Sequence, residues 1–567
     1  MKKQLIIILI LLLAVAIAPS SAHTVRIWKN KPLQQQFTND CAVYIISDDI
    51  DLRGSTIKIP NGATIQFCKG GALSNGIVSG SFSLKGVRQN SFRVLVKPGS
   101  RILDEMPIYN QTPSINVSVM SACVGSIVMM SDIVTDSDVT LSCSLDGRGH
   151  TLTATSKASS VLRVIDYQGP GIVIKDVEIK RDYSGTINKN YVLLCDNSSN
   201  ISILNASLEG RLRFTNRTLA EAPDKASQNI HIKGCVLTCD LSICPQGWEW
   251  GQDHISFYSV KDVVIEECNI ISTNVNRILK TSQYFPEKDY TVVNHCSNNI
   301  LFRNNNVIGR CTYGKQMWDM YCGTTNVTIE GNSFDLKGFT RFIEDKAYQD
   351  KFDEKGLVSS CIRIVNNKVK TYGSDLFQFR ASASCDSFEV IGNTFVMCGS
   401  NHNPLTEYKR SCGGYLQGYK SAVIRDNSFT WEDEAVNLLF LKVNYDCAQT
   451  IIENNCLVDV YRINITSAKH PVSSYETPAS GSLFRYSGNK KKYSQVFART
   501  REELYVADMS FDNLEVEFED NDLNDSYEIV FAKNATFGTV NYKTKALKSK
   551  SFLKQGKTVR WKAFISK

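Results

Sequence analysis

The sequence predicts an all-β fold, a right-handed parallel β-helix, from two observations. One octet of residues recurs through the middle of the chain about every 30 residues, and each copy begins with the apolar–polar alternation of a β-strand. Self-similarity at this period is the signature of a solenoid. Crossovers between parallel strands are right-handed in nearly all proteins, and this sets the expected hand of the coil.

The octet has a strand–bend–strand pattern. Its third and eighth residues are apolar in all eleven copies, and its fifth residue is Gly, Asn or Asp in all but one, where Glu267 stands. Gly, Asn and Asp tolerate the left-handed backbone conformation of a sharp bend. The copies begin at Ile172, Ile201, Ile230, Val263, Ile300, Val327, Ile362, Phe388, Ala422, Thr450 and Val516.

The sixth residue of the octet predicts an internal ladder. It is an asparagine in seven later copies, and Cys235 and Cys268 hold the same place in two earlier ones. A buried amide is costly unless it is hydrogen-bonded, and asparagines stacked at the strand spacing of about 4.8 Å can bond to one another and to the backbone. The expected ladder residues are Asn305, Asn332, Asn367, Asn393, Asn427, Asn455 and Asn521.

This pattern resembles the pectate-lyase-like superfamily of parallel β-helices, in which asparagine ladders and aliphatic stacks are familiar. The resemblance covers Ile172 to Val460, about half of the chain. The earlier segment Leu52–Leu84, with its alternating strands and glycine-rich bends, resembles the opening segment of exported β-helix proteins from gut Bacteroidetes. The resemblance implies the fold and a carbohydrate-related role, but no catalytic motif of a particular family is present.

The sequence divides into four parts along this repeat. We expect a signal peptide at residues 1–22, an N-terminal cap with the first coils at 23–135, regular coils at 136–460, and late coils with a basic closing element at 461–567. A cap is needed because an open end of the solenoid would expose unpaired strand edges.

Residues 1–22 have the features of an export signal. Lys2 and Lys3 precede an apolar run from Leu5 to Ile17, and small residues follow it up to Ala22. The run is short for a membrane span, and we find no transmembrane segment in the rest of the chain. We therefore expect an exported protein, periplasmic or extracellular, and a monomer.

The charge distribution excludes a nucleic-acid-binding protein. The net charge is +7, but the range 541–567 alone carries nine basic residues and no acidic one. Without this tail and the two lysines of the leader, acidic residues slightly outnumber basic ones, so there is no general basic surface for nucleic acid.

The 18 cysteines allow two interpretations. An exported protein can use cysteines for a disulfide framework, or it can bury them as small apolar residues. Because Cys235 and Cys268 fall at a repeat position, we expect most cysteines to be reduced or buried between coils. No pair of CxxC motifs indicates a structural zinc site.

Four insertions between octets point to a ligand-binding face. They span Thr238–Gln252, Ser272–Asp289, Leu336–Val358 and Met397–Gly413. Insertions at one place in a coil project from one face of a solenoid, and such faces commonly bind ligands. Trp248 and Trp250 lie in the first insertion and can either stack on sugar rings or pack the loop onto the helix.

The strand before each octet carries polar residues. If the apolar residues face inward, a mixed stripe of charged and amide groups faces outward over several coils, long enough for several sugars. Its members are His254, Lys280, Asp319, Arg341, Asp345, Gln378 and Arg380, with Asp253 and Glu344 beside them. For each residue alone, a solvated polar face is the favoured explanation, and the cluster as a whole is stronger evidence for a site than its members.

Two reactions fit such a groove. β-Elimination of a uronate needs a base for the C5 proton and positive charge for the carboxylate. The candidates to supply them are Arg277, Lys280, Arg341 and Lys346. They act alone or with a metal held by Asp or Glu, such as Ca²⁺, which the pattern does not require. Glycoside hydrolysis needs two carboxylates, for which Asp253, Asp319, Glu344 and Asp345 are candidates.

A third interpretation is a non-enzymatic glycan-binding or adhesive β-helix. The sequence favours an exported enzyme that cleaves an acidic or complex polysaccharide, with lyase preferred to hydrolase because cations are as frequent as carboxylates along the stripe. The expected catalytic residues are His254, Arg277, Lys280, Asp319, Arg341 and Glu344, and the expected substrate-binding residues are Trp248, Trp250, Asp345, Gln378 and Arg380.

Overall fold

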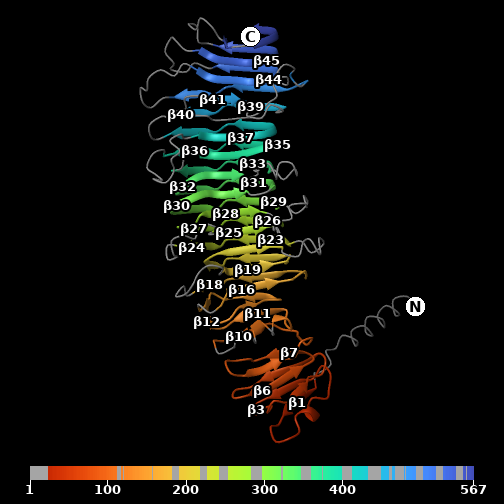
Figure 1. The fold of residues 1–567 in the computed structure, drawn as a ribbon. Coiled ribbons are helices and arrows are strands. Elements are labelled where there is room, and N and C mark those ends of the chain that lie inside the picture. The colour runs from red at the N-terminus through yellow and green to blue at the C-terminus, as the bar shows by residue number, and fades with distance from the viewer. Residues whose placement is uncertain are drawn as a thin grey trace, which may run out of the picture.

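The computed structural model is a long stack of parallel coils, with β1 (Thr24–Ile27) near one end of the stack and β45 (Glu528–Thr544) near the other (Figure 1). It describes residues 23–110, 117–118, 121–155, 158–181, 191–216, 227–241, 253–282, 297–320, 323–345, 359–372, 375–398, 412–431, 448–458, 463–466, 478, 480–492, 502–518, 528–544, 553–556 and 559–566. The predicted leader, Trp248 and Trp250 lie outside these residues.

Two small parallel sheets begin the described chain. One has the strand order β1 (Thr24–Ile27), β2 (Val43–Ile46), β5 (Ala63–Phe67), β7 (Ser81–Lys85) and β9 (Arg101–Ile102), with a 3-10 turn at Gln34–Gln36. The other contains β3 (Asp49–Asp51), β4 (Thr56–Lys58), β6 (Ala72–Ser79) and β8 (Phe92–Val96). These strands lie at the N-terminal end of the stack, where the sequence predicted a cap.

All later strands, from β10 (Met106–Ile108) to β47 (Val559–Ser566), belong to one sheet of 38 strands. Through the regular coils each strand pairs in parallel with the strand one coil later, so a coil contributes one strand to each of three faces. The fold is the predicted right-handed parallel β-helix.

The first face is formed by the first strand of each octet, and the second face by the strand after the bend. The first face contains β11 (Ser126–Met129), β14 (Ser144–Asp146), β17 (Ile172–Lys175), β20 (Ile201–Leu204), β23 (Ser227–Lys233), β26 (Val260–Glu266), β29 (Asn298–Arg303), β31 (Thr325–Glu330), β33 (Ser360–Val365), β39 (Gln449–Glu453) and β42 (Leu483–Ser487). The second face contains β12 (Ile133–Thr135), β15 (Thr151–Ala154), β18 (Glu178–Arg181), β21 (Ser207–Glu209), β24 (Val236–Asp240), β27 (Asn269–Thr273), β34 (Lys368–Thr371), β36 (Thr394–Met397), β38 (Ser428–Trp431), β40 (Cys456–Val458) and β43 (Lys490–Lys492).

The third face lies between the end of one octet and the start of the next. It contains β13 (Val139–Thr140), β16 (Ser160–Ile165), β19 (Tyr191–Asp196), β22 (Leu212–Thr215), β25 (Asp253–Tyr258), β28 (Arg277–Ser282) and β41 (Ile463–Thr466). Six long strands turn a corner from one face to another, and the chain closes with β46 and β47. The long strands are β30 (Asn306–Met320), β32 (Ser333–Asp345), β35 (Asp375–Ile391), β37 (Cys412–Arg425), β44 (Glu502–Phe518) and β45 (Glu528–Thr544), and β46 spans Leu553–Gln555.

The bend of the octet has the predicted backbone conformation. The fifth residue has a positive φ in every copy from Asp176 (50°) to Asn454 (54°), and Glu267 follows the rule with a φ of 58°. A non-glycine residue in this region is uncommon, and Glu267 has no short polar side chain that would favour it. The packing of the strands on both sides therefore imposes the bend on Glu267.

The asparagine ladder is present, and each member bonds to both neighbouring coils. The Oδ1 of Asn332 accepts from the backbone N–H and the side-chain Nδ2 of Asn305, at 2.8 and 3.0 Å. The Nδ2 of Asn332 donates to the carbonyl of Phe302 at 2.9 Å. The same contacts repeat through Asn367, Asn393, Asn427 and Asn455 to Asn489.

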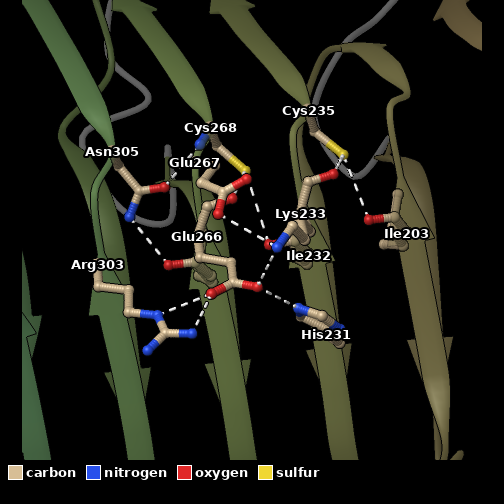
Figure 2. A network of polar contacts seen from close by, with 11 residues as sticks. Ile203, His231, Ile232, Lys233, Cys235, Glu266, Glu267, Cys268, Arg303 and Asn305 are labelled. Atoms are coloured by element: carbon tan, nitrogen blue, oxygen red, sulfur yellow. Dashed lines mark hydrogen bonds and ion pairs between the residues drawn. The ribbon is translucent and has the colours of Figure 1, made fainter.

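Two cysteines continue this stack toward the N-terminus (Figure 2). The backbone N–H of Cys268 donates to Oδ1 of Asn305 at 2.9 Å, which joins the cysteines to the ladder. The Cys268 and Cys235 thiols donate to the carbonyls of Ile232 and Ile203, one coil earlier, at 3.7 and 3.4 Å. The structure describes the side chains of twelve cysteines; all twelve are free thiols and seven are buried. The prediction that most cysteines pack between coils is confirmed for this part of the chain.

The late coils differ from the prediction in two ways. Asn489 belongs to a regular coil formed by β42 and β43, which the sequence pattern missed because Lys491 stands where an apolar residue was required. The eleventh octet, which begins at Val516, is out of register with the coil before it. In that coil the repeat begins at Phe484, but Val516 pairs with Tyr486, the third residue of that repeat. Asn521 lies outside the described residues.

Within the described part of the chain, no helix is long and apolar enough to cross a membrane.

Candidate active site

The third face carries a row of polar residues at one position on six consecutive strands. Their neighbours one residue earlier form the buried row Leu212, Ile255, Leu279, Trp318, Ile343 and Phe377. The polar row is Arg213, Ser256, Lys280, Asp319, Glu344 and Gln378. Lys280, Asp319 and Gln378, which the sequence predicted in one outward stripe, occupy this one register position, but Asp319 and Gln378 are buried.

A second polar row lies three residues earlier in the same strands. It contains Asp253, Arg277, Gln316 and Arg341, which pair in register. Nη1 of Arg341 lies 3.0 Å from Oε1 of Glu344, three residues later in strand β32. In a straight strand, residues three positions apart face opposite sides of the sheet. The contact between Arg341 and Glu344 therefore shows that β32 bends between the two rows.

Arg277 joins two carboxylates that lie on the coils before and after it. Its Nη1 is 2.9 Å from Oδ1 of Asp253, and its Nε forms an ion pair of 2.6 Å with Oδ2 of Asp319, although the latter is not aligned as a hydrogen bond. All three side chains are at most 4% exposed. The sequence predicted Arg277 and Asp319 as site residues, and the structure brings them together.

The charges of this cluster hold one another in the ionised state. Burial alone would raise the pKa of Asp253, but Lys280 and Arg277 outweigh it and hold the pKa below its usual value. Burial would lower the pKa of Lys280, but Asp253 and then Tyr258 outweigh it, and the pKa is raised. Asp253 is therefore a carboxylate and Lys280 an ammonium at neutral pH.

Beside this cluster, Arg213 and Lys280 both lie close to the aromatic ring of Tyr258. The guanidinium carbon of Arg213 lies 4.7 Å from the ring centre of Tyr258, and Nζ of Lys280 lies 5.4 Å from it. Nη1 of Arg213 donates to the hydroxyl of Tyr191 at 3.0 Å. Arg213, Tyr258 and Lys280 are partly exposed, so this part of the row reaches the surface.

The sequence prediction did not include Tyr191, Arg213 or Tyr258. The coil that contains Arg213 lies in a short interval between the octets at Ile201 and Ile230, with no long insertion to mark it. A signal was present, because Arg213 alternates with the apolar residues Leu212 and Phe214 as an outward residue should.

The prediction that His254 faces outward is wrong. The residue is completely buried, and it stands level with the core residues Ile278, Met317 and Phe342. Its Nδ1 lies 2.8 Å from the hydroxyl of Ser272. Burial, helped by the charge of Arg211, lowers the pKa of His254 to about 3, so the imidazole is neutral. A neutral side chain inside the coil has no access to a polymer.

The other predicted residues take different positions. Asp319, Glu344 and Gln378 are 1%, 5% and 4% exposed, so they lie below the surface of the described structure. Asp345 pairs in register with Met320 and Phe379, and Arg380 pairs with Gln417. The side chains of Asp345 and Arg380 lie outside what the structure describes.

Oxygen ligands for a cation such as Ca²⁺ are present only in part. Among the described residues, no three His, Cys, Asp or Glu side chains form a group that could hold a metal ion. Gln378 Oε1 is buried without a hydrogen-bond partner within the same residues and is in register with Glu344. Glu344 and Gln378 are therefore the residues that we would examine first for Ca²⁺, which prefers oxygen ligands.

Comparison with known proteins adds little to this description. No family model matches the sequence, and no curated protein matches it. A solved structure described as a mannuronic-acid-specific polysaccharide family 6 lyase from human gut microbiota aligns over 80% of this chain and 91% of its own, with 10% identity and a TM-score of 0.32. A similarity this weak carries no argument about the present chain, whose fold and site rest on its own structure.

Proposed function

We propose that the protein cleaves an acidic polysaccharide by β-elimination on its third face, at Arg213, Tyr258 and Lys280. The observation that carries the proposal is the placement of Arg213 and Lys280 on the strands either side of β25, with both cations close to the ring of Tyr258. Two cations at a partly exposed aromatic surface suit a polymer with one carboxylate on each sugar.

Each group has a role in this reaction. Arg213 and Lys280 bind the uronate carboxylate and stabilise the negative charge that develops when the C5 proton leaves. The phenolate form of Tyr258 can accept that proton and becomes the phenol. The bond between C4 and the glycosidic oxygen then breaks, a C4=C5 double bond forms, and the departing oxygen takes up a proton from Tyr258 or from water.

The buried cluster supports this surface. Asp253 and Asp319 hold Arg277 by ion pairs, and Asp253 also helps to keep Lys280 charged. Arg277, Asp319 and Glu344 are thus proposed to position the exposed groups instead of contacting the polymer, which revises the roles expected from the sequence. Arg341 is partly exposed and next to Glu344, so it extends the cationic surface.

The geometry favours elimination over hydrolysis. A glycosidase needs a carboxylic acid that is protonated near neutral pH, usually because its pKa is raised. The pKa of Asp253 is lowered, and both Asp253 and Asp319 are bound to one arginine. These two carboxylates are therefore poor candidates for a general acid.

The location and assembly predicted from the sequence belong to the same proposal. We propose that the protein acts outside the cytoplasm, as residues 1–22 predict, and that it acts as a monomer on a polysaccharide partner. Cell fractionation and the molar mass in solution test these two points.

The test is a panel of uronic-acid and neutral polysaccharides, read for ultraviolet absorbance of the unsaturated product and for new reducing ends. Elimination gives both signals on the acidic polymers. Reducing ends without absorbance would assign the protein to the hydrolases, and binding without either signal would leave the adhesive function.

A further inference from the structure

A second groove runs along the first face, away from the candidate active site. It has a volume of about 980 Å³ and is open along its length. Its residues come from strands β17, β20, β23, β26, β29 and β31 and from the bends before them. It therefore follows the axis of the β-helix over six consecutive coils.

The floor of the groove has one residue per coil. These residues occupy a single register position, and each lines the groove. They are Val173, Ser202, His231, Val264, Leu301 and Thr328. The floor is thus a narrow strip of apolar and small hydroxyl side chains with His231 near its middle.

One edge of the groove is a row of amides. The bend just before or near the start of each of five first-face strands holds Asn200, Asn229, Asp262, Asn299 and Asn326, all with φ between 53° and 60°. Nδ2 of Asn229 donates to Oδ1 of Asn200, and Nδ2 of Asn299 to Oδ1 of Asp262, both at 2.9 Å. These contacts fix the side chains, and the row presents one amide or carboxylate group per coil, about 4.8 Å apart.

The opposite edge is held by Glu266 (Figure 2). Its carboxylate is 5% exposed and lies 2.7 Å from Nε of Arg303, 3.1 Å from Nζ of Lys233 and 3.0 Å from Nε2 of His231. Arg303, Lys233 and His231 thus each interact with the carboxylate of Glu266. With Asp262 and Glu267 nearby, the groove has no excess of positive charge that would select an anionic polymer.

From this geometry we propose that the groove binds a neutral polysaccharide lying along the helix axis, with successive sugars on successive coils. Apolar floor residues such as Val264 and Leu301 fit the carbon faces of sugar rings, and the amide row fits their hydroxyl groups. The rise per coil is comparable to the length of one pyranose unit, so each sugar meets the same set of groups.

An extended peptide fits the groove less well. Peptides bind to sheets mainly by adding a strand to an open edge. Strands β20, β23, β26 and β29 are each paired in parallel on both sides, so the floor offers no open edge. Recognition has to come from side chains, as it does for a glycan.

The proposal is tested by electrophoresis of the full chain through native gels that contain a soluble neutral polysaccharide, such as xyloglucan, galactomannan or hydroxyethylcellulose, or an anionic one, such as alginate or polygalacturonate. We expect at least one neutral polymer to retard the protein. Val264→Arg places a long charged side chain on the floor and should weaken this binding about tenfold or more.

Val423→Arg is the matched control. Val423 occupies the same register position five coils further on and does not line the groove. It should keep wild-type retardation, and thermal unfolding of both variants checks that they are folded. Val264→Arg should also keep cleavage of acidic polymers, which depends on the third face, so the two proposals can fail separately.

The groove assignment is overturned if no neutral polymer retards the wild-type protein, or if Val264→Arg is retarded as strongly as Val423→Arg.

Discussion

The guanidinium of Arg277 lies 2.9 Å from the carboxylate of Asp253 on the preceding coil, and neither side chain is more than 4% exposed. This pair forms the base of the candidate active site, because Asp253 also helps to keep Lys280 charged. A buried ion pair contributes little net stability when intact, but removing one partner leaves a buried charge uncompensated.

Arg277→Met should therefore lower the free energy of unfolding by about 3–5 kcal/mol. Arg363→Met is the control, since its ion pair with Glu389 is half exposed and should contribute no more than about 1 kcal/mol. Denaturant unfolding of both variants measures the difference. Equal losses of stability would contradict the buried pairing.

The asparagine ladder makes a second prediction. Asn367→Leu removes an amide whose Nδ2 donates to Ile329 and Asn393, and it leaves buried neighbours without partners. We expect a loss of about 1–3 kcal/mol in unfolding free energy. Asn306→Leu, at an exposed position with one long contact to Asn269, should change stability little. If the two variants unfold alike, the ladder does not stabilise the coil.

Stability should fall as the pH is lowered below neutrality. The pKa of His254 is about 3 in the folded protein and about 6.5 when unfolded, so the unfolded state binds the extra proton between these values. The contribution of His254 is complete above pH 6.5 and is lost on acidification, by about 2 kcal/mol between pH 7 and pH 5. Unfolding at both pH values, compared with His254→Gln, measures this slope. A variant with the wild-type slope would contradict the buried neutral imidazole.

At least twelve thiols should react in the denatured, unreduced protein, because the twelve described cysteines are free. Seven of them are buried, and the thiols of Cys235 and Cys268 donate to backbone carbonyls, so these cysteines pack without a disulfide partner. A count below twelve would show that some of these cysteines are bridged.

Chelation of divalent cations should leave cleavage unchanged, since Arg213 and Lys280 supply the positive charge at the site. Assays with and without EDTA decide this. Loss of activity that Ca²⁺ restores would instead assign the carboxylate binding to a metal held near Glu344 and Gln378.

The fold was predictable from sequence because the octet repeats a local rule. A residue that tolerates the left-handed conformation is followed by a buried asparagine or a small residue. This pair of residues can be recognised in each copy of the octet without knowledge of the other coils. The rule missed the coil of Asn489, where Lys491 broke the pattern, and it misplaced Val516. In both cases the position of the strand is determined by its register with the neighbouring coil. The sequence does not show this register.

The site was predictable only in part for a similar reason. Simple alternation predicted Lys280, Asp319 and Gln378 in one outward stripe; the three share a register position, but Asp319 and Gln378 are buried. It failed for His254, because the third-face strands bend and two consecutive residues, His254 and Ile255, are both buried. The cluster around Tyr258 depends on contacts between three coils, and no spacing along the chain indicates them.

The central claim is that Arg213, Tyr258 and Lys280 perform the elimination, and Tyr258→Phe tests it most directly. Tyr372→Phe is the matched control, because Lys370 lies 5.6 Å from the ring of Tyr372, which directly follows the second-face strand β34 and is not one of the proposed catalytic residues. The measurement is the initial rate of unsaturated product formed from the best acidic polymer of the panel. We expect the rate to fall about a hundredfold or more in Tyr258→Phe and to remain at the wild-type level in Tyr372→Phe. Equal rates in the two variants would contradict the proposed active site.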